Sequence, residues 1–519
     1  MPDLVQLLRR VLLFLRQRAG SGEGDAAQHR AALLEILGDN IPAERARYDE
    51  DPLGWEPGDL ESLRDKYSRV LGVGVEGRPT DYLLIDGAGL PELYGDPDLE
   101  PGPTHVLLAM LISEGCATQF ASGNWDGLVE KALSDISSSE SLIDVYVDVD
   151  DPRDAHGHAE IAKFHGCAVL ALAQPDRYRG KIIATNAQIS KLHGDPEFAH
   201  MKDHLRDLTT RKRSLILGLS VQDSDLLAIF RGAASRSPWR WDPTHPAYLF
   251  AEPAIAASQR DVLEVAYGEE FGRERTNVIR RSALGAYAGP VVAAVLLEVL
   301  AAKMIAAMER HHPLNGAVLA SLRPGIRRLI VRIVARYGRD ESALAEFLRG
   351  GYSDLIRTYL GPLTSGDAKY LPFARATRNQ LSTDPGVVAM GLDLLAIALG
   401  LLGLGERAGR WRLSLSNESK GSRISISGRS GGTTTTVIVV RSAAEAIAAM
   451  ESNDWVEGDG EMVLLQMQKG PSALPRSPGG RIGRGRITRS RHDLSWSALS
   501  DSVSDVDELM ARFEAGAKL

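Results

Sequence analysis

The first half of this chain alternates short, unbroken apolar runs with longer segments of helical periodicity. Continuous apolar runs are typical of strands buried on both faces, and their alternation with helices predicts a parallel sheet covered by helices. We therefore expect an α/β domain over residues 1–250. The strand candidates are VLLFL (residues 11–15), LIDVYVDV (142–149), CAVLALA (167–173), KIIAT (181–185) and SLILGLS (214–220), the first of which also fits an amphipathic helix.

The pattern changes after residue 250. Residues 251–405 have alanine and leucine at helical spacing almost throughout, which predicts an all-α domain. Residues 406–519 combine three strand candidates (WRLSLS, SRISISG and TTTTVIVV) with two helix candidates (SAAEAIAAMES and a final acidic segment), which predicts a small α+β region. Within it, residues 470–492 are rich in glycine, proline and arginine. We expect a flexible stretch there, with a nucleic-acid contact as the alternative, although no aromatic residues interleave the arginines.

Charge and cysteine content exclude several classes of protein. The formal net charge is −8, so no overall positive field attracts nucleic acid or a membrane. Cys116 and Cys167 are too few for a four-cysteine zinc site or a disulfide framework, so we expect no zinc and a reducing, cytoplasmic compartment. The apolar residues 387–404 are about long enough to span a bilayer, but Asp393 lies near their middle. A buried helix explains them as well.

Polar side chains follow a short strand candidate near residue 120. The segment ATQFAS leads into a polar turn, GNWD, and then into a helical segment. Asn124 and Asp126 are therefore expected at the carboxyl end of a strand, where open α/β sheets bind ligands, and beside a helix N-terminus that favours an anion. Taken alone, Ser-x-Asn-x-Asp before a helix is also a common capping arrangement.

Two further segments carry candidate residues. His165 lies in KFHG and is followed by Gly166 and the strand candidate CAVLALA. Gly218 and Ser220 end another strand candidate, with Asp223 following. Each has a purely structural alternative: a core histidine for the first, and an ordinary strand–turn–helix for the second. The acidic run DVDVDDPRDAHGH offers hard-metal ligands, but its spacing fits no ligand motif, so we expect a solvated loop.

The order of these segments resembles the sirtuin-like superfamily, and more closely its NAD-consuming branch found in bacterial anti-phage defence proteins. That family has a T-x-N-x-D-x-L-x-E turn, a K-L-H-G strand start and a G-x-S-x-x-D strand end around one NAD pocket. The resemblance covers residues 104–230, and the 41 residues from Asn124 to His165 are compatible with it. The matching residues are Ser122, Asn124, Asp126, Glu130, Lys163, Phe164, His165, Gly166, Gly218, Ser220 and Asp223.

The sequence departs from the family pattern at three points. Ser122 and Phe164 replace the usual threonine and leucine, both of which are mild changes. No clean G-A-G-x-S phosphate loop occurs near the N-terminus. We prefer RAGSGEG, with Gly20, Ser21 and Gly22, because a strand candidate precedes it and a helix follows. The alternative is DGAGLPE (residues 86–92), which matches the G-A-G-x-S motif more closely.

The histidine is also ambiguous. His193 lies in a closer K-L-H-G match, yet only 25 residues then remain before Gly218, too few for the strands and helix that the family has there. We therefore prefer His165.

The resemblance implies a Rossmann-like domain that cleaves the nicotinamide–ribose bond of NAD. His165 would act as general base on a ribose hydroxyl, and Asn124 would orient the attacking water. Asp126 would hold the turn or the ribose, and Gly218 and Ser220 would contact the adenosine side. Because sirtuin deacylases typically carry a four-cysteine zinc module, hydrolysis to nicotinamide and ADP-ribose, or its cyclic form, is favoured over deacylation.

The resemblance further implies an effector of anti-phage immunity that works as a homo-oligomer or with a partner defence protein, without a membrane. The alternative is a catalytically inactive module that senses NAD or ADP-ribose, or that scaffolds a defence complex. The degenerate phosphate loop favours this alternative, whereas the presence of both Asn124 and His165 favours the enzyme.

Overall fold

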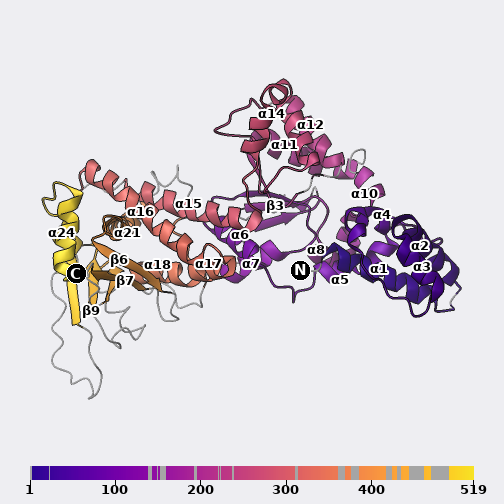
Figure 1. Ribbon diagram of the computed structural model, residues 1–519, viewed down its shortest axis with the longest axis horizontal. Helices are drawn as coiled ribbons and strands as arrows, with labels where there is room; N and C mark the ends of the chain where they lie inside the picture. The colour runs from indigo at the N-terminus through magenta and orange to yellow at the C-terminus, as the bar shows by residue number, and fades with distance from the viewer. Residues whose placement is uncertain are drawn as a thin grey trace, which may run out of the picture. The chain divides into compact units, whose positions relative to one another are not determined.

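The chain forms two compact units, and the predicted mixed α/β class is confirmed (Figure 1). Unit 1 comprises Met1–Pro101, Gln119–Glu130 and Ile143–Ala288, and unit 2 comprises Gly102–Thr118, Lys131–Leu142 and Gly289–Leu519. The computed structural model describes residues 3–22, 24–137, 143–148, 150–151, 159–191, 196–219, 221, 224–236, 239–309, 314–360, 369–375, 385–416, 423–428, 434–442, 461–468 and 490–519.

The sheet of unit 1 has three parallel strands in the order β1-β3-β2. They are β1 (Gln119–Ser122), β2 (Ile143–Tyr146) and β3 (Ala159–Lys163), so the expected strand in LIDVYVDV is confirmed as β2. Because the strands are parallel, their carboxyl ends lie at one edge of the sheet, the edge at which such sheets bind ligands.

A second parallel pair joins β4 (Ser214–Ile216), which lies within the predicted SLILGLS strand, to β5 (Tyr248–Phe250). Phe164, Ile216 and Phe250 belong to the same apolar cluster as Val262 and Phe271 of the following helices. Unit 1 therefore continues to Ala288, beyond the boundary predicted at residue 250, because the helices that follow β5 share its core.

Helices form the rest of unit 1. Those before the sheet are α1 (Leu4–Ala19), α2 (Ala26–Asn40), α3 (Pro42–Glu50), η1 (Glu61–Lys66), α4 (Tyr67–Leu71), η2 (Leu83–Gly87) and α5 (Leu90–Tyr94). Those after β3 are α8 (Ala168–Ala173), α9 (Pro175–Tyr178), η4 (Arg179–Lys181), α10 (Asn186–Lys191), α11 (Pro196–Arg211), α12 (Ser224–Arg236), α13 (Ala257–Tyr267) and α14 (Glu269–Ser282).

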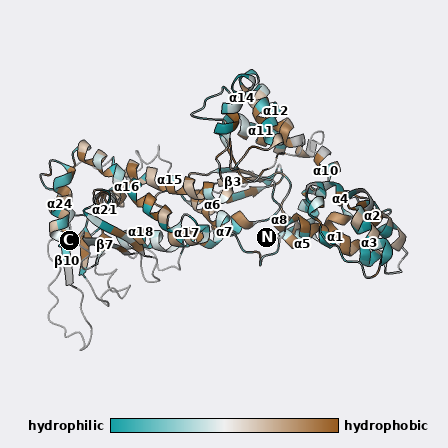
Figure 2. Cartoon of the chain, viewed as in Figure 1, coloured by the Kyte–Doolittle hydropathy of each residue, from teal (hydrophilic) through white to brown (hydrophobic). Residues whose placement is uncertain are grey.

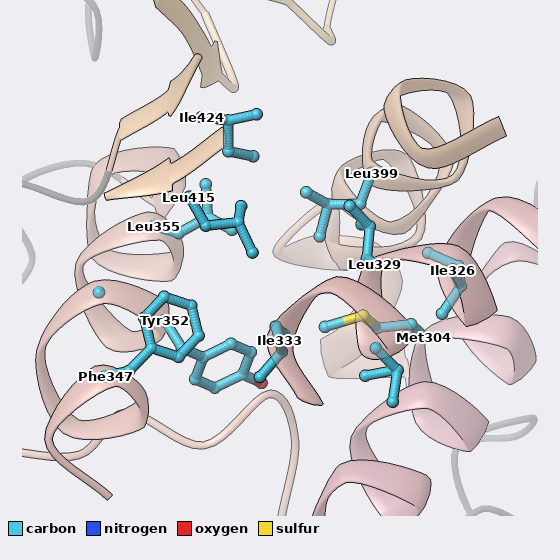
Figure 3. A pocket seen from close by; sticks show the side chains of 12 residues that line it. Met304, Ile326, Leu329, Ile333, Phe347, Tyr352, Leu355, Leu399, Leu415 and Ile424 are labelled. Carbon is cyan, nitrogen blue, oxygen red and sulfur yellow. The ribbon is translucent and has the colours of Figure 1, made fainter. Parts of the chain in front are cut away.

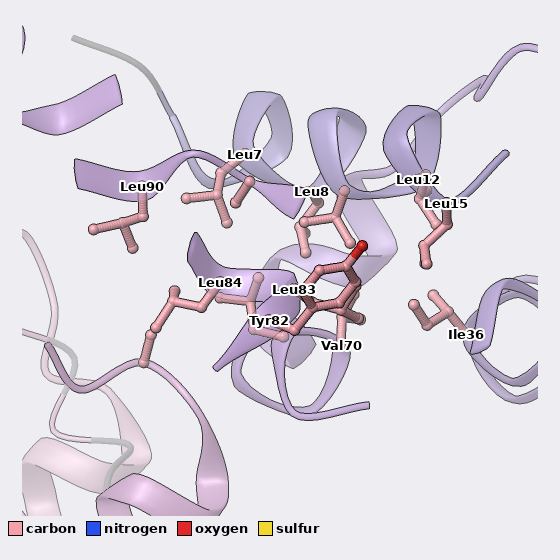
Figure 4. Packing of buried hydrophobic residues seen from close by; sticks show 14 of the residues in the cluster. Leu7, Leu8, Leu12, Leu15, Ile36, Val70, Tyr82, Leu83, Leu84 and Leu90 are labelled. Carbon is pink, nitrogen blue, oxygen red and sulfur yellow. The ribbon is translucent and has the colours of Figure 1, made fainter. Parts of the chain in front are cut away.

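The segment VLLFL lies inside helix α1, so its helical alternative is the correct one. Asp3 caps the helix by accepting a hydrogen bond from the Gln6 N–H at 2.7 Å. Leucine and valine recur at three- and four-residue spacing along one face of α1 and are buried. In Figure 4, Leu90 of α5 lies toward the Leu7 end of that face, whereas Leu15 lies toward Ile36 of α2.

Two other strand predictions are wrong. CAVLALA forms the short helix α8, because alanine and leucine favour a helix and only Val169 is β-branched. In KIIAT, Lys181 ends η4 and the next residues form no strand. Their backbone is instead satisfied locally: the Ile183 N–H donates to the His165 carbonyl at 3.0 Å.

Unit 2 contains a five-stranded sheet in the order β10-β9-β8-β7-β6. The three predicted C-terminal strands are confirmed, whereas the predicted helix SAAEAIAAMES and most of the glycine- and arginine-rich stretch lie outside the described residues. The strands are β6 (Trp411–Ser416), β7 (Arg423–Gly428), β8 (Thr435–Val440), β9 (Glu461–Gln466) and β10 (Ser490–Ser495). The helices are α6 (Pro103–Ser113), α15 (Ala288–Met308), α16 (Gly316–Tyr337), α17 (Glu341–Phe347), η5 (Leu348–Tyr352), α18 (Ser353–Leu360), α20 (Pro385–Ala389), α21 (Leu392–Arg407), α23 (Trp496–Ser500) and α24 (Val506–Ala517), while α7 (Leu128–Ile136) begins in unit 1.

The apolar stretch at residues 387–404 is divided between two helices. Gly391, with φ +71°, separates α20 from α21, and Asp393 is buried in the first turn of α21. Among the described residues, α15 is the one helix long and apolar enough to cross a membrane, as its colouring in Figure 2 illustrates, yet 67% of its most apolar window is buried within the protein. A core helix of unit 2 explains both observations.

A buried ion pair holds three distant segments of unit 2 together. Lys303 of α15 contacts Glu114, which follows α6, at 2.7 Å, and it also donates to the main-chain oxygens of Glu114 and Ala374. The other carboxylate oxygen of Glu114 accepts from the Tyr370 hydroxyl at 2.6 Å and from the Phe373 N–H at 3.0 Å. Every polar atom of the pair's carboxylate therefore has a partner.

Beside this pair lies an apolar cavity of about 60 Å³, shown in Figure 3. Side chains from α15, α16, α21 and β7 line it, including Met304, Ile326, Leu399 and Ile424. Tyr352 is on its wall, buried, and its hydroxyl has no hydrogen-bond partner. The cavity is thus an apolar space next to one unsatisfied polar atom.

Candidate active site at the carboxyl edge of the sheet

Asn124 and His165 follow the ends of two strands of unit 1 that are paired with each other. Ser122, the last residue of β1, lies directly opposite Lys163, the last residue of β3. The Phe164 N–H donates to the Ser122 carbonyl at 3.1 Å, which extends the pairing by one residue. Asn124 and His165 each follow two residues after those strand ends, so the register brings the two motif residues to one edge.

Gly123 brings the two segments into contact. A Cβ atom at this position would lie 3.1 Å from Phe164 Cζ and 3.3 Å from His165 Nδ1. The backbone beside Asn124 therefore packs directly against the imidazole, with Asn124 exposed and His165 6% exposed. The sequence analysis assigned no role to Gly123, although a glycine at a strand end is a signal for a close approach.

Local hydrogen bonds fix the turn that carries Asn124. Its N–H donates to Ser122 Oγ at 3.1 Å, and the Leu128 N–H donates to Asp126 Oδ1 at 3.1 Å at the start of α7. Asp126 is buried. Ser122 and Asp126 therefore shape the turn and cap the helix, the alternative that the sequence left open, and this arrangement leaves the Asn124 side chain toward solvent.

A buried lysine joins that turn to β3. Lys163 is 2% exposed, and its ammonium lies 2.7 Å from Glu130 Oε1 on α7. It also donates to the main-chain oxygen of Asp126. The structure thus explains why a lysine and a glutamate belong to the motif: they pair across the two segments of the site.

The segment beyond His165 is equally confined. Gly166 has φ +89°, and a Cβ there would lie 2.7 Å from the Lys181 carbonyl oxygen, so both its conformation and its surroundings require glycine. The Phe164 ring meets the imidazole edge-on with centroids 4.5 Å apart. The His165 backbone is therefore held on both sides.

Trp125 ties the turn to the N-terminal helices. Its indole N–H donates to the Ile183 carbonyl at 3.1 Å, and its ring lies 5.3 Å from that of Tyr94. Burial, together with the carboxylates of Asp3 and Asp126, raises the pKa of Tyr94 to about 12. Tyr94, at the end of α5, and Asp3, at the start of α1, are thus both near the turn.

The structure places the two phosphate-loop candidates at different distances from this site. Gly20, Ser21 and Gly22 follow the last residue of α1, whose 16 residues span about 24 Å, so they lie at the end opposite Asp3. The preference for Gly20–Gly22 is therefore not supported by position. Gly89, in the alternative DGAGLPE, directly precedes α5, whose last residue contacts Trp125.

The third motif is only partly described. Gly218 follows β4 with φ +63° and open space around its Cα, so it suits a left-handed turn that a ligand can approach. The next residue, Leu219, has its carbonyl bound by the Gln259 side chain at 3.1 Å. Ser220, Asp223 and His193 lie outside the described residues, so their roles, and the choice of His165 over His193, stay predictions.

The acidic run after β2 is neutralised where it is described. Asp148 lies 3.4 Å from the Lys181 ammonium, and Asp151 accepts hydrogen bonds from the Tyr178 hydroxyl and from Arg177, each at 2.6 Å. No group of three His, Cys, Asp or Glu side chains suited to a metal ion occurs in the described part of the chain.

A comparison with protein families agrees with this geometry. Residues 118–271 match the sequence model of the SIR2-like domain, a range that contains β1 to β5, Asn124, His165 and Gly218. Searches of curated proteins and of solved structures gave no match. Residues 118–271 of this chain therefore form a SIR2-like domain, in agreement with the resemblance to the sirtuin-like superfamily.

Proposed function

We propose that this protein hydrolyses NAD at the nicotinamide–ribose bond. The observation that carries the proposal is the convergence of Asn124 and His165 at the carboxyl edge of the sheet, with Gly123 packed against the imidazole. An exposed amide and a nearly buried imidazole at the same edge of the sheet offer a water-binding group and a base.

The proposed reaction takes NAD and water to nicotinamide, ADP-ribose and a proton. The bond between C1′ and the nicotinamide nitrogen breaks through an oxocarbenium-like state, and the nicotinamide leaves as a neutral molecule. Water held by Asn124 attacks C1′, and His165 accepts a proton through a ribose hydroxyl. Attack by an adenine nitrogen in place of water gives the cyclic product.

The diphosphate side favours the Gly87–Gly89 segment over Gly20–Gly22. Gly89 has φ +60°, and a Cβ there would lie 3.6 Å from Glu92 Oε2 and 3.8 Å from a guanidinium nitrogen of Arg10, an exposed cation. Backbone without a side chain next to a cation suits a phosphate. Arg10→Ala is therefore expected to weaken ADP-ribose binding measured by calorimetry, whereas Ser21→Ala is not.

The test of the activity is nicotinamide release from NAD by the purified full-length protein at high concentration. Asn124→Ala and His165→Ala should each lower turnover by about 100-fold or more, whereas His193→Ala should retain it. If turnover is lost in His193→Ala and kept in His165→Ala, His193 and not His165 is the general base. Turnover unaffected in both Asn124→Ala and His165→Ala would contradict the site.

The second candidate is an inactive module that binds NAD or ADP-ribose. One observation favours it: the described residues of 3–101 form helices and turns without a strand, so no strand–loop–helix phosphate site precedes β1. ADP-ribose binding without NAD turnover, in the protein alone and with phage-infected lysate added, would support this candidate.

The family resemblance also suggests the setting, an effector of anti-phage defence acting as an oligomer or with a partner. A plaque assay tests this role. Bacteria expressing the wild-type chain should resist at least one phage and lose NAD on infection, and bacteria expressing Asn124→Ala should do neither.

A further inference from the structure

Lys163 occupies an unusual position for a lysine. It ends β3, two residues before His165, and it is 2% exposed. A buried ammonium is costly unless it is paired and hydrogen-bonded, so its retention there calls for partners of matching charge.

Those partners belong to the other half of the site. The ammonium donates to the main-chain oxygen of Asp126, within the turn that carries Asn124, and pairs with Glu130 Oε1 at 2.7 Å. Glu130 is in the first turn of α7, the helix that Asp126 caps. One side chain thus connects the strand that ends before His165 to both the turn and the helix after Asn124.

The charge of Lys163 is maintained in this setting. Burial alone lowers the pKa of its ammonium, but the charge and hydrogen bond of Glu130 outweigh burial and raise the pKa above its ordinary value. The ammonium therefore stays protonated, and able to donate, throughout the neutral pH range.

The pair is not a closed unit. Glu130 Oε2 is buried without a hydrogen-bond partner, while its side chain is 19% exposed. A buried ion pair is most stable when both carboxylate oxygens have hydrogen-bond partners. Here one oxygen has none, and the second hydrogen bond of the ammonium goes to the main-chain oxygen of Asp126 in the turn. The hydrogen bond from Lys163 therefore fixes the position of the turn.

We propose that Lys163 is a positioning residue, which keeps the Asn124 turn in register with His165 during NAD hydrolysis. The inference rests on the proposed function for its catalytic consequence, but the positioning itself is measurable without activity. Displacement of a reacting group by about 1 Å can cost on the order of 100-fold in rate, so a loosened turn should lower kcat far more than it changes KM.

The main test variant is Lys163→Met/Glu130→Gln, which removes the ammonium without leaving a buried carboxylate unpaired. Glu130→Gln alone keeps the donation from Lys163 to Asp126 and serves as the milder variant. Tyr267→Phe is the matched control, because it removes a different buried hydrogen bond of unit 1, the one accepted by the Tyr267 hydroxyl from the Ala247 N–H at 2.8 Å.

Two measurements are made on the full-length variants. Hydrogen exchange read by mass spectrometry reports on peptides spanning residues 122–128, and steady-state kinetics reports kcat and KM for NAD. In the double variant we expect exchange in this peptide at least about tenfold faster and kcat about 100-fold lower, with KM within threefold. Glu130→Gln should be intermediate, and Tyr267→Phe should resemble the wild type in both.

Exchange in residues 122–128 that is as slow in the double variant and in Glu130→Gln as in the wild type would overturn the proposal. So would a fall in kcat no larger than that of Tyr267→Phe. If the wild type releases no nicotinamide, the proposed function fails, and exchange alone decides on Lys163. If the double variant does not fold, Glu130→Gln decides by the same two measurements.

Discussion

Each unit of this protein contains a buried lysine paired with a glutamate, and the two pairs differ in how completely they are satisfied. In unit 2, Glu114 is fully buried, one of its oxygens contacts Lys303, and the other accepts from Tyr370 and from the Phe373 N–H. In unit 1, Glu130 has one unpartnered oxygen. Both lysines also donate to main-chain oxygens, Lys163 to that of Asp126.

The difference separates a fully satisfied pair from one that lies beside the proposed site. A fully satisfied pair offsets its own desolvation and fixes the segments around it, as Lys303 does for α6 and α15. A pair with an unsatisfied buried atom is less stabilising, because that atom loses its hydrogen bonds to water without replacement. The incomplete pair here lies two residues from His165.

The largest expected effect comes from breaking the complete pair. Lys303→Met leaves the buried carboxylate of Glu114 without its cation, and we expect a loss of about 3–5 kcal/mol in the free energy of unfolding. Denaturant unfolding of the full-length protein measures it. Lys303→Met/Glu114→Leu should recover only part of the loss, because Tyr370 and the Phe373 N–H then lack an acceptor. Full stability in the single variant would show that the pair is not a structural clamp.

A smaller effect distinguishes the two stacked tyrosines beside that pair, whose ring centroids lie 6.0 Å apart. Burial raises the pKa of both hydroxyls well above the ordinary value, so both are neutral donors near pH 7. Tyr370→Phe removes a hydrogen bond to a carboxylate and should cost about 1.5–3 kcal/mol, whereas Tyr352→Phe removes an unsatisfied hydroxyl and should be neutral or stabilising. Thermal unfolding compares them, and equal losses would contradict this assignment.

The smallest effect concerns pH and unit 1. Burial lowers the pKa of His204, whose ring contacts the Tyr146 hydroxyl, below its ordinary value of 6.5. The unfolded chain then binds a proton more readily than the folded one, so stability falls as the pH drops below about 6.5 and levels off below the folded pKa. His204→Gln should flatten this acid dependence of the unfolding temperature between pH 7 and 5. An identical slope in variant and wild type would rule out His204 as its source.

The sequence indicated the position of Asn124 better than that of His165. Asn124 was expected at the carboxyl end of a strand, where it lies, because a polar turn after a short apolar run depends on local order alone. His165 was expected at the start of a strand in CAVLALA, but it follows the end of β3, which was not among the strand candidates. The run in CAVLALA is equally compatible with a helix, and only its tertiary surroundings decide in favour of α8.

Contacts between distant segments lay beyond the sequence. Nothing in the sequence indicates that Ser122 is paired with Lys163, or that Glu114 contacts Lys303, which is 189 residues away in the chain. The preference for Gly20–Gly22 assumed a strand at residues 11–15, where the chain forms helix α1, and a role of this loop in phosphate binding stays a prediction. Charged residues flanked by apolar ones, at Lys163 and Lys303, were the available signal for buried pairs.

The assignment of the chain to its two units changes five times along the sequence, with residues 102–118 and 131–142 of unit 2 inserted between parts of unit 1. A single proteolytic cut therefore cannot release either unit, and a gene fragment limited to residues 118–271 lacks the first 101 residues of unit 1 and includes residues 131–142 of unit 2. Exchange of either unit by recombination would therefore need several junctions rather than one.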